Sequence, residues 1–111
     1  MAYDEDLADR MRALLAGEPD VTEKAMFGGL AFLVGGNMAI SASGQGGALV
    51  RVDPDHSDHL VTTTSAELAV MRGRPMPGWL RVAAADLRTE RQLRAWVTRG
   101  VGYARSLPPK R

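Results

Sequence analysis

Two histidines lie close together in this chain, and histidine is the side chain whose ordinary pKa is nearest neutrality. His56 and His59 are three residues apart, and Asp55 precedes His59 by four. On a helix these side chains share a face, so two imidazoles and a carboxylate could hold one metal ion. They could equally form the solvated face of a short helix, because catalytic zinc sites also need a dry pocket and outer hydrogen-bond partners. A metal-dependent enzyme using His56 and His59 is therefore a lesser hypothesis, and we expect no cofactor.

A second group of residues suits binding. Arg72, Arg74, Met76 and Trp79 lie within eight residues that also contain two prolines and two glycines, and this density predicts an irregular loop over 72–78. Arginine and tryptophan dominate the binding energy of protein interfaces and stack on unpaired bases. Alternatively, Trp79 begins a strand and buries its ring, which leaves the two arginines as solubilising charges. We interpret these four residues as the contact surface for a partner.

Several kinds of chemistry are excluded. The 111 residues contain no cysteine, which removes disulfides, thiol catalysis and cysteine zinc sites. The phosphate-loop, dinucleotide and zinc-protease motifs are absent. The glycines at 44–47 precede a predicted strand, whereas a phosphate loop precedes a helix, so a turn explains them better. We therefore predict no catalytic residue.

The net charge of +1 conceals two unlike halves. Residues 1–55 carry four basic and nine acidic side chains, and residues 56–111 carry ten and four. The isoelectric point near 8.2 lies below the value of about 9 that is typical of duplex-binding domains. Nucleic-acid binding would need Arg91, Arg94 and Arg105 to join Arg72 and Arg74 in one patch. A protein partner, or a second copy of this chain, is the preferred interpretation.

Three segments have helical signatures. Leu7, Met11 and Leu14 recur at helical spacing over 4–16. Asp53 followed by Pro54 predicts the start of a short helix to about 61. Thr89 with Gln92 forms a capping box for a helix to 107. We expect Gly100, within the apolar face of that helix, to let it approach a sheet closely.

Short β-rich runs predict strands. Gly35-Gly36 suits a hairpin turn, whereas Gly28-Gly29 is interpreted as a bulge or bend that redirects one long strand. Met26, Met38 and Met71 are expected in the core, and the tail 108–111 is expected to fray. The predicted strands are 24–27, 30–34, 38–43, 48–52, 67–71 and 79–83.

These elements predict one α+β domain over residues 1–111. We expect two layers: an antiparallel sheet of about five to six strands, packed against N-terminal and C-terminal helices and one short middle helix. No apolar run is long enough to span a membrane, and the acidic N-terminus lacks the positive charge of a secretion signal. We therefore expect a cytoplasmic protein with no membrane partner.

The segment Thr22 to Leu33, followed by Gly36-Asn37-Met38 and by Leu49 to Asp53, resembles the N-terminal domain of the TfoX/Sxy family. The acidic first helix, the segment 71–79 and the closing helix are also similar. The resemblance implies a two-layer α+β fold with helices on an antiparallel sheet. The residues that match the family motif are Met26, Phe27, Gly28, Gly29 and Asp53, which we expect to serve the fold through glycine conformation, core burial and helix capping.

The resemblance further implies regulation and not catalysis. The family is named for members that promote competence gene expression alongside a cyclic-AMP-dependent transcription activator, and it supplies no catalytic residues to transfer. Those full-length regulators carry a second, C-terminal helical domain, which we do not expect here. We expect a stand-alone, non-enzymatic interaction module that acts by protein–protein contact. The alternatives are a nucleic-acid-binding accessory protein with an arginine-rich surface and the metal-dependent enzyme.

Overall fold

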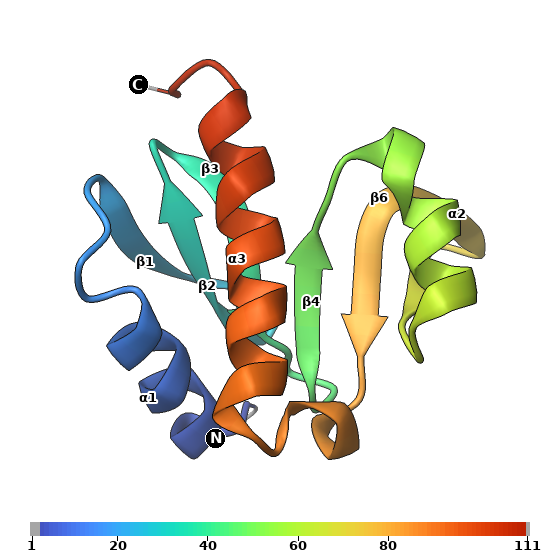
Figure 1. The fold of residues 1–111 in the computed structure, drawn as a ribbon, viewed down its shortest axis with the longest axis horizontal. Helices are drawn as coiled ribbons and strands as arrows, with labels where there is room; N and C mark the ends of the chain where they lie inside the picture. Colours follow the sequence, from blue (N-terminus) through green and yellow to red (C-terminus); the bar gives the residue numbers. More distant parts are fainter. Residues whose placement is uncertain (1–2, 111) are drawn as a thin grey trace.

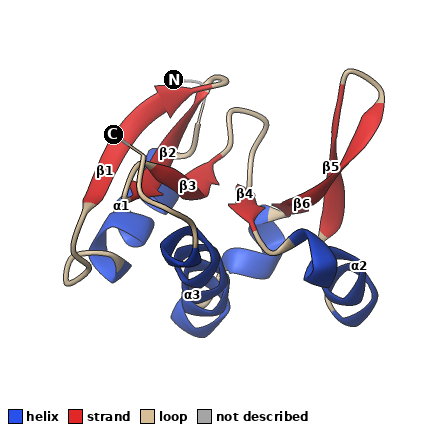
Figure 2. Ribbon diagram, turned by 90° about the horizontal axis from the view of Figure 1, so that it is seen from above, coloured by secondary structure: helices blue, strands red, loops and turns tan. Residues whose placement is uncertain are grey.

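Six antiparallel strands form one open sheet, in the order β1-β2-β3-β4-β6-β5, and the helices cover one of its faces (Figures 1 and 2). The computed structural model describes residues 3–110. This two-layer arrangement confirms the predicted α+β class and the six-strand sheet. The elements are α1 (Glu5–Leu14), β1 (Val21–Met26), β2 (Gly29–Val34), β3 (Asn37–Ala42), β4 (Ala48–Arg51), α2 (Pro54–Thr63), β5 (Glu67–Met71), β6 (Arg74–Val82), the 3-10 helix η1 (Ala84–Leu87) and α3 (Glu90–Ser106).

Each α-helix begins at a side chain that caps its free amides. Asp4 accepts a hydrogen bond from the Leu7 amide at the start of α1. Asp53 accepts one from the Asp55 amide at 2.9 Å, which confirms its predicted capping role. Thr89 and Gln92 exchange both bonds of the predicted capping box at the start of α3. Local sequence therefore determines where these helices begin.

The main core lies between the sheet and the helices. Phe32 and Ile40 from the sheet and Met11 from α1 are fully buried there. α3 approaches the sheet closely because Gly100 faces β3, where a Cβ atom would lie 2.3 Å from the Ala39 carbonyl oxygen. This confirms the close approach expected at Gly100.

An ion pair joins α1 to the edge strand β1. The Arg12 guanidinium donates to both carboxylate oxygens of Glu23, at 2.6 and 2.8 Å, and lies over the Phe32 ring. The hydrogen bonds from Arg12 lower the pKa of Glu23, although partial burial opposes the shift. The same bonds raise the pKa of Arg12. Glu23 is therefore better accommodated as a carboxylate in the folded chain than in the unfolded chain.

Two-residue turns join three of the strand pairs. Gly35-Gly36 forms the predicted hairpin turn between β2 and β3, with positive φ at both residues. The predicted bend at Gly28-Gly29 is wrong, because Phe27-Gly28 is a turn between two separate strands and Met26 pairs with Gly29. Arg72-Gly73 is the third such turn, between β5 and β6. Positive φ at both residues matches the twist of a hairpin.

The predicted irregular loop over 72–78 is also wrong, because β6 runs from Arg74 to Val82. β4 pairs with β6 over 79–82 only, so Pro75 and Pro77 lie where β6 has β5 as its one neighbour. A proline lacks the amide hydrogen that a second neighbouring strand would need. The register between β5 and β6 shifts near Leu68, where Gly78 has a φ of +87°.

The C-terminal tail is held against the sheet. The Lys110 amide donates to the Gly35 carbonyl at 2.7 Å, and the buried Asn37 side chain donates to the Pro108 carbonyl at 2.9 Å. The expected fraying is therefore wrong for 108–110, and Arg111 lies outside the described residues. None of the helices within residues 3–110 combines the length and the apolar character needed to cross a bilayer.

Two glycines of α3 provide a matched pair of substitutions. Gly100→Ala is expected to lower the free energy of unfolding by about 1–3 kcal/mol, because the new methyl group overpacks against β3. Gly102 has open space around its Cβ position, so Gly102→Ala should raise it by up to about 1 kcal/mol through helix propensity alone. Urea unfolding of both variants checks this. Equal effects of the two substitutions would contradict the close approach of α3 to the sheet.

The Arg12–Glu23 pair predicts a pH dependence of stability. Because folding lowers the pKa of Glu23, its contribution is present above the unfolded-state pKa and is lost as the pH falls through the folded-state value. Glu23→Gln should therefore destabilise the protein at neutral pH and have a vanishing effect in acid. Urea unfolding at about pH 7 and about pH 3 measures the difference. Glu67→Gln is the control, and a pH-independent effect of Glu23→Gln would count against the ion pair.

Candidate functional site

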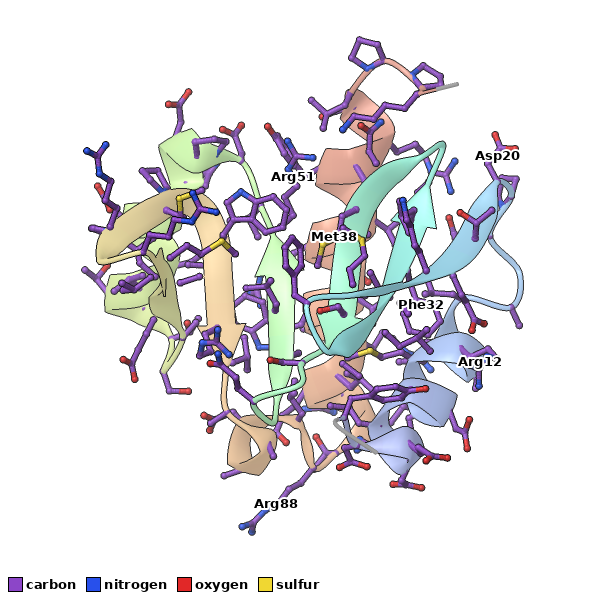
Figure 3. All side chains as sticks on the ribbon, turned by 180° about the vertical axis from the view of Figure 1, so that it is seen from behind. Arg12, Asp20, Phe32, Met38, Arg51 and Arg88 are labelled. Atoms are coloured by element: carbon purple, nitrogen blue, oxygen red, sulfur yellow. The ribbon has the colours of Figure 1, made fainter. Side chains whose placement is uncertain are left out.

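The sheet face opposite the helices, called here the open face, carries a second apolar cluster. Paired residues of neighbouring strands share a face, so the register aligns Ala31, Ser41, Leu49 and Arg81 across it. Figure 3 shows Met38 on this face. The cluster consists of buried Ala31, Met38, Leu49 and Ala69, with Met26, Leu33, Met71 and Trp79 packed against it.

The open face contains a cavity of about 320 Å³, called here the open-face groove. It touches the β1–β2 turn and also the end of the β5–β6 hairpin, although β1 and β5 are the opposite edges of the sheet. Both hairpins extend away from the helix layer (Figure 2). The groove therefore crosses the strands. Its lining residues are Met26, Phe27, Gly29, Ala31, Met38, Ser41, Ser43, Gly44, Gln45, Leu49, Val70, Met71, Arg72 and Arg81.

Phe27 lies at the rim of this groove and is 78% exposed, so the expected core burial of Phe27 is wrong. Val70, across the groove, is 59% exposed. These two are the large hydrophobic side chains that the described part of the chain leaves in water. An exposed apolar rim above an apolar floor is typical of a binding surface.

The glycines next to Phe27 explain why its turn is held in place. A Cβ atom on Gly29 would lie 2.3 Å from the Ala42 carbonyl oxygen, and one on Gly44 would lie 2.6 Å from that of Gly28. The β1–β2 turn thus packs backbone to backbone against the neighbouring β3–β4 connection. Gly28 itself has a φ of +77°. Positive φ at Gly28 and the close backbone contact at Gly29 agree with a structural role for these glycines, whereas the Phe27 side chain is exposed.

Phe27 and Arg72 share an unusual backbone conformation. Their φ angles are +52° and +53°, in the left-handed region that costs roughly 1–2 kcal/mol for a residue with a Cβ atom. Both occupy the first position of a two-residue turn, and both line the groove. Strain of this kind gathers at binding and catalytic sites. Of the three non-glycine residues with positive φ within residues 3–110, two therefore line this groove, and Asp20 lies outside it.

The open face is rich in cations. Arg81 donates to the Ser43 hydroxyl at 3.2 Å, and the register places Lys24 and Arg74 on the same face. Among residues 3–110, Glu67 is the carboxylate that the strand register places there, opposite Arg81. No ion pair within the described residues includes Arg72. The groove rim is therefore positively charged.

The predicted contact residues gather on this face. Arg72 lines the groove, and Arg74 and Met76 pair with Met71 and Ala69 of the open-face cluster. Trp79 packs against the same cluster beneath the Arg51 guanidinium, 5.1 Å from its ring centre.

Sequence reasoning missed Phe27 as a surface residue. The signal was available, since a residue followed by glycine between two β-rich runs is the pattern of a two-residue hairpin turn. The methionines were also interpreted too simply. Met38 is buried, but Met26 and Met71 are half-buried beside the groove.

The histidines lie elsewhere, in a groove of about 430 Å³ between α2 and α3. His56 is 71% exposed, with its Nδ1 atom 3.7 Å from an Asp53 oxygen, and His59 is also exposed. Asp55 does not line this groove. No group of three metal-ligating side chains forms within residues 3–110. The geometry that the metal hypothesis required is thus not found there.

The arginine patch required for nucleic-acid binding does not form either. Arg91, Arg94 and Arg105 belong to α3 on the helix layer, whereas Arg74 lies on the open face. Arg94 pairs with Glu90 at 3.2 Å, and Arg105 pairs with Glu18 at 2.6 Å. A larger groove of about 720 Å³ between α1 and α3 is lined by both signs of charge. The open-face groove is the candidate site, because apolar floor, exposed phenylalanine and uniform charge coincide there.

The model of the TfoX N-terminal domain family matches residues 13–104. The matched range contains all six strands, and therefore every residue that lines the open-face groove. No curated protein and no solved structure shows a significant match to this sequence.

Replacing Phe27 separates folding from binding. Asparagine tolerates positive φ better than phenylalanine, so Phe27→Asn is expected to leave the midpoint of thermal unfolding unchanged or to raise it. Burial of a phenylalanine in a core would instead make its removal cost about 3–5 kcal/mol. Calorimetry distinguishes the two cases. Gly44→Ala serves as the comparison, because its methyl group would meet the Gly28 backbone and must destabilise.

Proposed function

This chain belongs to the TfoX N-terminal domain family, and we propose that it is a non-enzymatic regulatory module that acts by binding a protein partner on the open face of its sheet. The observation that carries this proposal is the exposed Phe27 at the rim of an apolar groove. A large apolar side chain in water is unfavourable by roughly 1.5–3 kcal/mol relative to burial, and a partner would recover that free energy.

The floor of the groove suits an interface. Met38 and Leu49 are buried there, and Met26 and Met71 line the groove beside them. Methionine side chains are unbranched and polarizable, so they adapt to the shape of an apolar ligand. Strands hold these side chains from below, while the two hairpins carry the rim.

The polar groups of the groove support docking over turnover. Its lining contains the guanidinium groups of Arg72 and Arg81, the hydroxyls of Ser41 and Ser43 and the amide of Gln45, and neither a histidine nor a carboxylate. General acid–base catalysis needs a group that exchanges protons near neutral pH, and arginine does not. The groups present can bind and orient a partner.

Affinity capture from native lysate, with and without nuclease, tests the proposal. Wild-type chain should recover a defined protein in both conditions, and Phe27→Asn should lose it while remaining folded. The double variant Arg74→Ala with Met76→Ala should also lose it, with stability nearly unchanged. Arg91→Ala on the helix layer is the control and should behave as wild type.

Recovery of the same protein by both Phe27→Asn and the double variant would refute the open face as the site. Loss of the wild-type signal after nuclease treatment would instead identify a nucleic-acid-binding protein.

A further inference from the structure

We infer that the open-face groove binds an acidic segment of the partner protein that also carries bulky apolar side chains. The inference rests on the proposed function and specifies its ligand. Three features of the structure support it: the apolar groove floor, the cations around the groove and the extent of the cavity across the strands.

The floor selects apolar side chains. Met38 and Leu49 are buried beneath the cavity, with the half-buried Met26 and Met71 beside it. A leucine or phenylalanine of the partner entering between them would also cover the exposed ring of Phe27. Removing these surfaces from water provides affinity without directional contacts.

The rim selects carboxylates. Arg72 and Arg81 line the groove, and the register places Lys24 and Arg74 on the same face. Arg81 has one hydrogen bond, to Ser43, which leaves further guanidinium donors available. Within residues 3–110, Glu67 of the edge strand β5 is the one carboxylate that the register places on this face. Complementary charge steers encounter and suppresses like-charged partners.

The same charges disfavour two other occupants. A second copy related by a two-fold axis would place identical cation-rich rims against each other. A single-stranded nucleic acid would match the charge but needs aromatic platforms for its bases. Among residues 3–110, Phe27 is the one aromatic residue that is mostly exposed, and Trp79 already stacks with Arg51. The floor of the groove is aliphatic.

The probe for this inference is a pair of synthetic peptides of about ten residues, one alternating aspartate with leucine and the other lysine with leucine. An extended peptide of that length spans about 33 Å, enough to cross a molecule with a 31 Å axis. The readout is the NMR signal of isotope-labelled methionine methyl groups. Met11 is fully buried between α1 and the sheet and serves as an internal control.

The aspartate peptide should shift the methyl signals of Met26, Met38 and Met71 and leave Met11 unmoved. Its affinity should fall as salt rises from about 50 to about 500 mM, because the Debye length shortens. Arg72→Asn with Arg74→Gln should weaken binding about tenfold. Arg91→Gln on α3 should leave binding unchanged. The lysine peptide should produce no shifts.

The outcomes separate this inference from the proposed function. Equal binding of both peptides, or of neither while capture from lysate succeeds, overturns the acidic ligand and leaves the protein-binding module intact. Shifts of the same methyl groups on concentrating the chain alone would identify a second copy as the occupant, and shifts with a short single-stranded DNA would identify a nucleic acid. Either result overturns the inference. Peptide binding with failed capture would support the groove chemistry and refute the proposed function.

Discussion

The helices of this protein cover one face of its sheet, and that constraint organises the rest of the structure. α3 lies close above β3 because Gly100 has no side chain, and the helix thereby closes the main core over Phe32 and Ile40. Side chains alternate between the two faces of each strand, so the opposite face must also carry residues. No second layer covers this face, and Phe27 and Val70 at the groove remain exposed. A two-layer fold therefore leaves one face of the sheet uncovered.

The open face also has features that the lack of a covering layer does not explain. Its apolar cluster contains Met38 and Leu49, and two hairpins bound it with turn residues in left-handed conformations. Glycine would relieve that strain at Phe27 and at Arg72. A phenylalanine and an arginine at these positions bring one apolar and one charged group to the same groove. The two side chains match the two kinds of contact that a protein ligand offers.

Local rules predicted the elements whose causes are local. The caps at Asp53 and Thr89 and the Gly35-Gly36 turn each follow from one residue and its neighbours. The failure at Phe27-Gly28 was a missed local signal, whereas two other predictions failed where a segment distant in sequence decided the outcome. The prolines of β6 are tolerated because β4 is shorter than β6, and the tail is ordered because it reaches the β2–β3 turn. Both β4 and the β2–β3 turn are far along the chain from the residues whose structure they decide.

The sequence by itself determined the helices, most strands and the two-layer class, and it predicted a contact surface at Arg72, Arg74, Met76 and Trp79. Tertiary structure decided which face those residues share and that Phe27 and Arg72 line one groove. It also decided that the arginines of α3 lie on the other layer and that His56 and His59 meet no third ligand within residues 3–110. The physical reason is the distance along the chain over which each interaction acts. Capping and turn preferences act within a few residues, whereas a binding surface depends on strand order and register, which join residues far apart in the chain.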